Sequence, residues 1–386
     1  MRLVIYATRL RLVANWFVDA LLTVYPARRI INGVALVRLD AIGDFILWLD
    51  SAKEYRRLYA GQRIVLIANA VWADWAAKFP YWDEVWSFDL RRFRRNPAYR
   101  VKMLAKVRLA GFEIVIQPTY SRTFEGDSLI RVSGAAQRIG SIGDESNISA
   151  TVKALSNRWY TQLIPATERS LMELERNAEF IRNLSGLPYD AAMPQLPDCT
   201  VSARYVPSQN DYFVIFPGAS WTGKQWPLEK FAELASRLHA KVGWTVVLCG
   251  GPNDVALCQL LGDKLSVPFV NSVGKTSLPE LAGLISNARL LISNDTSAVH
   301  IAAAMTIPAV CILGGGHYGR FLPYTPELPG IKPLVADHQM PCFNCNWVCS
   351  QVNDITRPVP CIDKVSVQSV LALALSVIKE SQKSGL

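Results

Sequence analysis

A short polar segment between two apolar runs holds the residues with the clearest chemical potential. Residues 293–300 read Ser-Asn-Asp-Thr-Ser-Ala-Val-His and precede an alanine-rich stretch. A strand that turns directly into a helix leaves the first N–H groups of the helix unpaired, and these donors bind phosphate together with the helix dipole. Asp295 or Thr296 can cap such a helix, and His300 follows about one turn later. Alone, the segment fits a phosphate site or an ordinary capped helix with a buried histidine equally well.

Two more polar loops follow predicted strands and carry groups suited to anion binding and proton transfer. Residues 38–44 read Arg-Leu-Asp-Ala-Ile-Gly-Asp and place a glycine turn before Asp44. Residues 216–227 contain hydroxyl groups, among them Ser220, and place Lys224 before a helix. Taken singly, a glycine after a strand serves many turns, and a lone lysine is more often a solvated charge. The recurrence of such polar and charged residues in several loops that each follow a predicted strand favours a ligand site.

A fourth loop, residues 249–254, also follows a strand and could bring Asn253 or Asp254 to a ribose hydroxyl. Four polar loops that each follow a predicted strand are hard to explain by the residue preferences of turns alone. Ligands of open α/β sheets bind at the carboxyl ends of the strands, so we expect these loops to face one another there.

Strands and helices alternate along most of the chain. Short apolar runs bounded by turn residues and separated by helical patterns indicate parallel sheets with helices on both faces. The predicted strands are 34–39, 64–67, 85–88, 114–116, 212–216, 245–248, 290–292 and 309–313. The pattern lapses at 187–210, which contains four prolines in a polar setting and reads as a linker.

We therefore predict an α/β protein with two doubly wound, Rossmann-like domains that face each other across a cleft. The predicted parts are a basic amphipathic segment at 1–32, a first domain at 33–190, a linker at 191–210, a second domain at 211–370 and a C-terminal helix or tail at 371–386.

Composition limits the class of partner. The 386 residues are 50% apolar and 19% charged, so large cores can form and extensive disorder is not expected. The net charge of +9 favours an anionic partner such as a phosphorylated glycan, an anionic membrane surface or nucleic acid. Eight dispersed cysteines without a cleavable signal pattern predict an intracellular chain with reduced thiols.

The segment 1–32 is basic and has one apolar helical face. The apolar side chains are Val13, Trp16, Phe17, Ala20, Leu21 and Val24, and the interrupting polar residues are Arg11, Asn15 and Asp19. This run is too short and too polar to span a bilayer. It predicts either a helix that lies on an anionic membrane surface or one that packs on its own domain.

Three of the four loops resemble the signatures of the lipopolysaccharide heptosyltransferases, glycosyltransferase family nine. The resemblance rests on Arg38 to Asp44, Pro217 to Ser220 with Lys224 to Pro227, and Asn294 to Thr296 with His300, and it covers roughly residues 33 to 370 in the family's order. It implies a GT-B fold and inverting transfer of a sugar from a nucleotide diphosphate sugar. The donor so implied is typically ADP-heptose, and the acceptor is a lipopolysaccharide core at the cytoplasmic face of a bacterial inner membrane.

The resemblance also assigns roles by position. It implies that Asp44 is the general base, that Lys224 contacts the donor phosphates and that Asp295 contacts the donor sugar. The remaining donor-site positions are Ser220 and Thr296 at the phosphates, His300 beside the diphosphate and, less securely because Asn253 aligns equally well, Asp254 at the ribose. One departure is Ser297, where the family usually has glycine, so the identity of the sugar stays open.

The residues fit this chemistry on their own terms. A positioned carboxylate can take the proton of an acceptor hydroxyl, and Lys224 with a helix N-terminus can stabilise a departing diphosphate. The chain has no Asp-x-Asp sequence, the pattern expected where a divalent metal holds a diphosphate. We therefore expect metal-independent transfer with no required cofactor.

A basic run offers a place for an anionic acceptor. Residues 91–108 contain eight basic side chains and no acidic one: Arg91, Arg92, Arg94, Arg95, Arg100, Lys102, Lys106 and Arg108. A solvated helix face is the ordinary explanation, but the absence of acids favours an anionic glycolipid, for which Arg91, Arg92, Arg94 and Arg95 are the candidate contacts. Nucleic acid ranks lower because no nucleic-acid motif accompanies the run.

Four cysteines near the C-terminus have spacing compatible with a structural zinc site: Cys342, Cys345, Cys349 and Cys361. The gap of three residues inside the cluster is shorter than usual for two ligand pairs, so an unmetallated structural cluster is the alternative.

Two other functions remain open at this point. A sugar-nucleotide epimerase also uses paired doubly wound domains, but it would need several carboxylates around one sugar carbon. A non-catalytic protein that binds a nucleotide sugar or lipid would have no use for the base Asp44.

Overall fold

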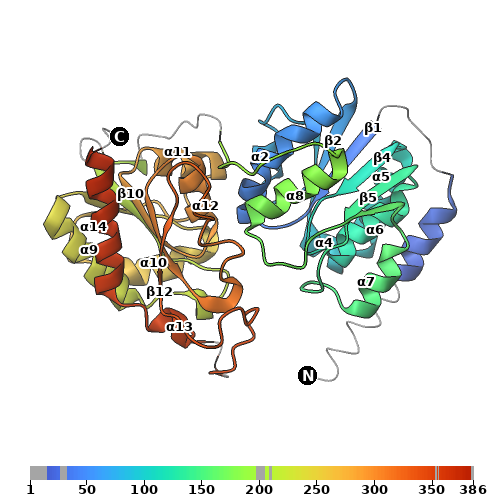
Figure 1. The fold of residues 1–386 in the computed structure, drawn as a ribbon. Coiled ribbons are helices and arrows are strands. Elements are labelled where there is room, and N and C mark those ends of the chain that lie inside the picture. The colour runs from blue at the N-terminus through green and yellow to red at the C-terminus, as the bar shows by residue number, and fades with distance from the viewer. Residues whose placement is uncertain are drawn as a thin grey trace. The chain divides into compact units, whose positions relative to one another are not determined.

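The structure is a computed structural model that describes residues 15–26, 33–196, 205–207, 211–352, 354 and 356–383 (Figure 1). Contacts within the chain form two compact units. The first comprises Met1–Phe45, Ser51–Arg169 and Glu175–Ala191, and the second comprises Ile46–Asp50, Ser170–Leu174 and Ala192–Leu386. Much of the predicted linker and most basic residues of the predicted N-terminal segment lie outside the described residues.

The first unit is built on a six-stranded parallel sheet with the order β3-β2-β1-β4-β5-β6. Its strands are β1 (Gly33–Arg38), β2 (Arg63–Asn69), β3 (Glu84–Phe88), β4 (Ile114–Gln117), β5 (Gln137–Ser141) and β6 (Gln162–Ile164). The first four were predicted: β1, β2 and β4 are largely buried and read as continuous apolar runs, whereas β3 is a partly exposed strand marked by Val85, Trp86 and Phe88. The short strands β5 and β6 lack such a run and were missed.

The helices of this unit are α2 (Ile42–Leu58), α3 (Ala73–Ala76), α4 (Leu90–Arg95), α5 (Pro97–Ala110), α6 (Phe124–Ser133), α7 (Ala150–Asn157) and α8 (Glu173–Ser185). Side chains of α4, α5 and α6 pack with those of the central strands in one apolar core. Helix α2 begins at Ile42, three residues earlier than predicted, so Asp44 lies in its first turn rather than in the preceding loop.

A helix at residues 15–24 buries an acidic side chain and leaves several of its apolar side chains exposed. Its polar residue Asp19 is fully buried and accepts two hydrogen bonds from Arg100, at 3.0 and 2.6 Å. Its apolar residues Phe17, Leu21 and Val24 are exposed by 57%, 67% and 81%. A buried ion pair of this kind costs about 3–5 kcal/mol when one partner is removed, so it fixes which face of the helix points outward.

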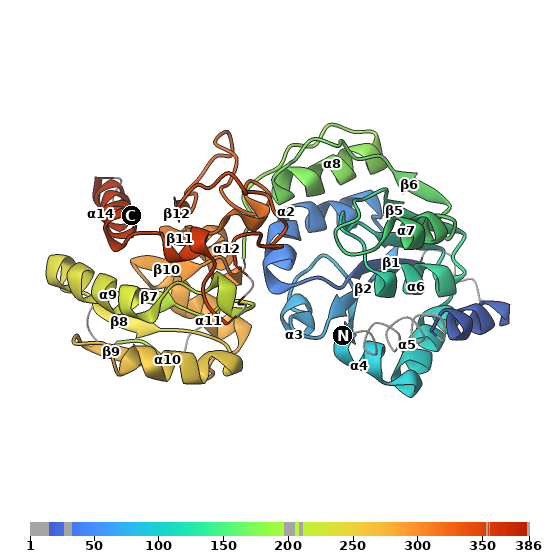
Figure 2. The same ribbon diagram turned by 90° about the horizontal axis from the view of Figure 1, so that it is seen from below.

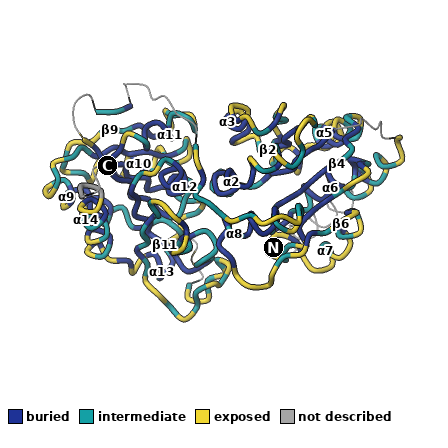
Figure 3. The backbone as a smooth tube through the Cα atoms, turned by 45° about the horizontal axis from the view of Figure 1, so that its top comes forward, coloured by how far each residue is buried: buried dark blue, intermediate teal, exposed yellow. Residues whose placement is uncertain are grey.

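The second unit repeats the architecture with the strand order β12-β11-β10-β7-β8-β9. The strands are β7 (Tyr212–Phe216), β8 (Thr245–Leu248), β9 (Phe269–Asn271), β10 (Leu290–Asn294), β11 (Ala309–Leu313) and β12 (Leu334–Asp337). All neighbouring pairs are parallel. Figure 3 shows the central strands of both sheets as buried, in agreement with their side-chain exposure. The predicted strands did not include β9 or β12.

The helices of the second unit are α9 (Leu228–Val242), α10 (Val255–Gly262), α11 (Leu278–Ser286), α12 (Ser297–Ala304), α13 (Pro360–Asp363) and α14 (Val367–Lys383). Helices α9, α10 and α14 cover one face of the sheet, and α11 and α12 pack together on the other (Figure 2). Short 3₁₀ helices η2 (Thr222–Lys224), η3 (Pro252–Asp254) and η4 (Gly315–His317) lie in loops after strands. The helix expected from Asn253 is thus η3 followed by α10.

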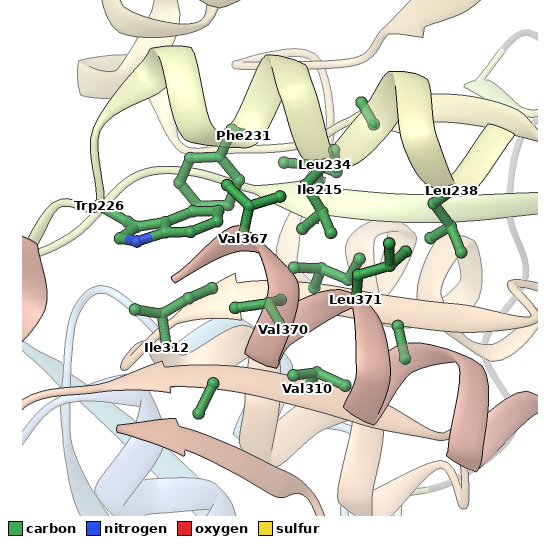
Figure 4. Close-up of a cluster of buried hydrophobic side chains, with 14 of the residues drawn as sticks. Ile215, Trp226, Phe231, Leu234, Leu238, Val310, Ile312, Val367, Val370 and Leu371 are labelled. Atoms are coloured by element: carbon green, nitrogen blue, oxygen red, sulfur yellow. The ribbon is translucent and has the colours of Figure 1, made fainter. Parts of the chain in front are cut away.

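The core beneath α9 and α14 explains why the C-terminal segment belongs to the second unit. Trp226 and Phe231 pack with Ile312 from the sheet and with Val370 and Leu371 from α14 (Figure 4). Because α14 begins at Val367 and its apolar side chains are buried in this core, the predicted boundary at 370 falls inside a helix and does not separate a tail.

Candidate functional site

The loops after β7 and β10 meet at the carboxyl edge of the second sheet. Lys224 Nζ lies 2.9 Å from Asp295 Oδ2, and the two side chains are only 13% and 12% exposed. The chain leaves β7 in one direction along the sheet and reaches β10 on its other side, so this pair sits at the topological switch point. Such a point is where open α/β sheets bind their ligands.

The buried side chain of Asn294 fixes this arrangement. Its Nδ2 atom donates to Pro217 O at 2.7 Å, and its Oδ1 atom accepts from Trp226 N at 3.1 Å. One amide therefore clamps both ends of the loop that carries Lys224 to the last residue of β10. The sequence motif included Asn294, but its clamping role was not predicted because its partners lie 68 and 77 residues away.

Thr296, rather than Asp295, caps helix α12. Its Oγ1 atom accepts a hydrogen bond from Ala298 N at 3.3 Å and lies 3.0 Å from Ser293 Oγ. Asp295 is left outside the cap, where its carboxylate pairs with Lys224. Ser297 is the first residue of the helix and is half-buried. The N-terminus of α12 thus lies beside a lysine, a combination that suits an anionic ligand.

The loop after β8 packs against the loop after β7 through Asp254. Asp254 Oδ2 accepts a hydrogen bond from Gly251 N at 2.8 Å, whereas Asn253 is exposed. A Cβ atom on Gly218 would lie 2.5 Å from Asp254 Oδ1, so this close approach requires glycine. Ser220 is exposed in the same loop as Gly218. The structure therefore brings Lys224, Asp254, Asp295 and Thr296 to one edge of the second sheet.

His300 is buried in α12 and is neutral near pH 7. Its side chain is 3% exposed, Nδ1 lies 2.9 Å from the hydroxyl of Tyr324, and the two rings stack. Burial lowers the pKa of His300 to about 4. The residue can position α12 or donate a hydrogen bond, but it supplies no positive charge. Tyr324, 24 residues further along, had no signal in the sequence.

In the first unit, Arg38 organises the loop that precedes Asp44. Arg38 is fully buried, and its Nε atom lies 2.7 Å from Asp40 Oδ2. Its two terminal nitrogens donate to Asn177 Oδ1 at 3.2 Å and to the main-chain oxygen of Asp44 at 3.4 Å. The half-buried Asp44 therefore stands in a helix first turn whose backbone is held by a buried guanidinium.

The basic run at 91–108 is not one continuous patch. Arg100 is buried against Asp19, and Arg108 donates to main-chain oxygens of Thr23 and Val132. Arg94 is bound through two hydrogen bonds to Glu125, at 2.7 and 3.2 Å. The sequence suggested a surface without acids, but Asp19 and Glu125 from other segments neutralise part of it. The exposed cations that remain are Arg91, Arg92, Arg95, Lys102 and Lys106.

The four candidate zinc ligands come together around one small cavity. Cys342, Cys345 and Cys349 are half-buried, Cys361 is buried, and Phe343 and Trp347 complete the wall. Burial raises the pKa of the Cys361 thiol. In the described part of the chain, no group of three or more histidine, cysteine or acidic side chains is arranged to hold a metal ion. A zinc site at these cysteines stays a prediction.

Comparison with known proteins shows the family of the chain. Residues 128–348 match the model of glycosyltransferase family 9 (heptosyltransferase). Lipopolysaccharide heptosyltransferase 1 of Pseudomonas aeruginosa is 24% identical over 303 residues, which cover 74% of this chain and 81% of that protein. Lipopolysaccharide heptosyltransferase 3 of Escherichia coli is 35% identical over 118 residues, 30% of this chain, so the match spans only 34% of that relative.

A solved structure extends the likeness to the fold. The structure described as Escherichia coli ADP-heptose lps heptosyltransferase II superposes with a TM-score of 0.67 at 18% identity, covering 91% of this chain and 99% of that one. The two chains therefore share the same architecture of two Rossmann-like units, the GT-B fold.

The buried state of His300 predicts a specific pH dependence of stability. Below about pH 6.5 the unfolded chain protonates this histidine, whereas the folded chain resists protonation down to about pH 4. The free energy of unfolding should therefore decrease by up to about 1.4 kcal/mol per pH unit between these values and be independent of this group above them. Urea unfolding of wild type and His300→Gln from pH 4.5 to 8 measures the difference.

Tyr324→Phe is the matched control, because it removes the hydrogen bond and leaves the ring buried. It should keep the pH slope of the wild type. Equal slopes for wild type and His300→Gln would show that this histidine is not held neutral by burial.

Proposed function

The chain belongs to glycosyltransferase family 9, and from this premise we propose that it transfers heptose, with inversion, from ADP-heptose to a lipopolysaccharide core. The observation that carries the proposal is the Lys224–Asp295 pair beside the capped N-terminus of α12, at the switch point of the second sheet. The proposed donor and acceptor are those named for the related lipopolysaccharide heptosyltransferases.

The second unit supplies charge stabilisation for the leaving group. As the bond between the anomeric carbon and the diphosphate oxygen breaks, negative charge develops on the diphosphate. The cationic Lys224 ammonium and the partly positive first N–H groups of α12 lie close together. Their electrostatic stabilisation of the developing negative charge is strongest where water is partly excluded from the site. Asp295 holds the lysine before the donor binds and is the candidate contact to the sugar. His300 assists as a neutral residue, and Ser220, Thr296 and Asp254 are the candidate polar contacts to the phosphates and ribose.

The first unit supplies the base. An acceptor hydroxyl is a weak nucleophile, and Asp44 would take its proton while the oxygen forms a bond to the anomeric carbon. Attack opposite to the leaving diphosphate inverts the configuration. Arg38 donates to the main chain of Asp44, which keeps the carboxylate at the start of α2.

Two alternative functions find less support. An epimerase needs several carboxylates at one sugar carbon, whereas Asp295 is paired with Lys224 and Asp254 accepts from Gly251. An epimerase would also consume donor without acceptor. A non-catalytic binding protein would bind ADP-heptose and show no turnover with any acceptor.

Substitutions of Asp44 and Lys224 should change kcat and the Kd for ADP in different ways. Asp44→Asn should lower kcat by about 10²–10⁴-fold and leave the Kd for ADP nearly unchanged, because the base acts only on the acceptor. Lys224→Met should raise the Kd for ADP and lower kcat, because the ammonium binds the diphosphate of the bound nucleotide and binds it more strongly as negative charge develops in the transition state. Assays of ADP release and calorimetric titration with ADP separate the effects.

Asp74→Asn is the control for Asp44, because Asp74 is an exposed acid in the first turn of another helix, α3. It should behave as wild type. Near-normal turnover of Asp44→Asn would rule out the proposed base.

We also propose that transfer needs no divalent metal, since Lys224 and the N-terminus of α12 would supply the positive charge that a metal would otherwise bring to the diphosphate. The rate should be the same in excess EDTA and in Mg²⁺. Loss of activity in EDTA that Mg²⁺ or Mn²⁺ restores would contradict this proposal.

The acceptor and the membrane surface are proposed to meet the exposed cations and the outward face of helix 15–24. Arg91, Arg92 and Arg95 are exposed on α4, and Arg94 can join them only by leaving Glu125. Phe17 also lines a cavity of about 730 Å³ whose wall includes Phe124 and Ile148. Arginines attract lipid phosphates, and exposed aromatic and aliphatic side chains insert into the headgroup region.

Among the described residues, no helix combines the length and the apolar character that crossing a bilayer requires.

The two surface features should contribute separately to vesicle binding. Arg91→Ala with Arg95→Ala should weaken flotation with phosphatidylglycerol vesicles by about 1 kcal/mol per arginine, reduce its salt dependence and raise the acceptor KM. Phe17→Ser with Leu21→Ser should weaken the part of binding that persists in high salt.

The control pair is Val255→Ser with Leu260→Ser, because these α10 side chains are exposed by 50% and 56% in the second unit. It should bind vesicles as wild type does. Equal loss in the control pair, or none in either test pair, would contradict the proposed membrane surface.

A further inference from the structure

Trp347 lies directly against the amine of the candidate donor-site lysine. Lys224 Nζ is 4.4 Å from the centroid of the Trp347 ring system, within the range of a cation–π contact. We propose that Trp347 is a positioning residue for Lys224 and that it makes the cysteine-rich loop, residues 342–349, part of the donor site. This inference rests on the proposed function, because it assumes that Lys224 binds a nucleoside diphosphate.

The cysteine-rich loop reaches the site by packing on the loop after β11. Asn344 N donates to Gly315 O at 2.6 Å, and Asn346 N donates to Gly316 O at 2.9 Å. A Cβ atom on Gly314 would lie 2.7 Å from the Trp347 ring, and one on Gly316 would lie 2.3 Å from it. The glycines after β11 therefore leave space that the indole fills. The strand β11 lies next to β10, so the loop after β11 places the indole at the same edge of the sheet as Asp295.

The backbone of the loop is bent in a way that side chains rarely adopt. Asn344, Asn346 and Trp347 have φ angles of 65°, 50° and 59°. Asparagine tolerates this left-handed region, but for a bulky tryptophan it is an outlier that costs about 1–3 kcal/mol. Such strain persists where surrounding contacts over-determine it, and it gathers at ligand sites. Here the strained residue is the one that contacts Lys224.

Neighbouring rings hold the indole in this orientation. Trp221 and His317 both pack edge-on against Trp347, with centroid distances of 6.1 and 6.3 Å. Trp221 directly precedes η2, the short helix that ends at Lys224. The indole is thus enclosed between the loop after β7 and the loop after β11.

The two neighbours of Lys224 restrain it by different means. Asp295 accepts a hydrogen bond and neutralises the ammonium, whereas the indole face attracts the cation without a hydrogen bond or a full counter-charge. A ring on one side also keeps water from that side of the amine, which strengthens its attraction to phosphate. Trp347 therefore holds Lys224 in place and leaves its charge available for the donor.

A double-mutant cycle and one conservative variant test this role through ADP binding. Trp347→Leu should raise the Kd for ADP about 3–10-fold, within the range measured for cation–π contacts, and Trp347→Phe should have a smaller effect. In the Lys224→Met background, Trp347→Leu should cause no further loss, because the ring acts through the lysine. Calorimetric titration of the full chain with ADP gives the four dissociation constants of this cycle.

Trp86→Leu is the matched control. Lys106 Nζ lies 3.9 Å from the Trp86 ring in the first unit, so the variant removes a similar lysine–tryptophan contact outside the donor site. It should bind ADP as wild type does.

The outcomes separate this inference from the proposed function. Equal weakening by Trp347→Leu with and without Lys224 would assign Trp347 a purely structural role and overturn the inference. An unchanged Kd for ADP in Trp347→Leu would also overturn the inference. Failure of the wild-type chain to bind ADP would instead overturn the proposed function on which the inference depends.

Discussion

The buried amide of Asn294 is the contact on which the candidate donor site depends. Parallel strands bring the loops after β7 and β10 to one edge, but they do not set the conformation of a loop. Asn294 does so by binding Pro217 O and Trp226 N, the two ends of the segment that carries Lys224. The amide is buried, so losing either partner would leave a polar atom without water or a hydrogen bond, which is costly. The position of the Lys224 ammonium beside Asp295 and α12 follows from this clamp.

Burial determines the charge of the site as much as residue type does. The family resemblance implies that His300 lies beside the diphosphate, but burial lowers its pKa to about 4, and its Nδ1 atom lies 2.9 Å from the Tyr324 hydroxyl. Lys224 lies in a largely enclosed position between a carboxylate, Asp295, and an aromatic ring, Trp347. The positive groups offered to a diphosphate are therefore the ammonium and the start of α12. Metal-independent transfer and a positioning role for Trp347 both build on this distribution.

Most of the strands that the sequence located are those whose apolar residues run without interruption. β1, β2, β7, β10 and β11 are buried on both faces, and their composition shows it. β5 and β6 lie toward one edge of the first sheet and mix polar with apolar residues, so no periodic signal marks them. The amphipathic spacing of helix 15–24 left two arrangements open for a related reason: it shows that two faces differ, but not which one packs inward. The pairing of Asp19 with Arg100, 81 residues away, decides that.

The sequence by itself determined the two parallel α/β units, the loops that carry polar groups and the identity of Asp44, Lys224, Asp295 and Thr296 as candidates, because short-range patterns of apolar and turn residues encode them. Only the tertiary structure decided which charged side chains form ion pairs within the protein, such as Arg94 with Glu125 and Arg100 with Asp19. It also decided that Trp347 faces Lys224. These contacts join segments far apart in the chain, and local sequence carries no record of which distant side chain will fill a given space.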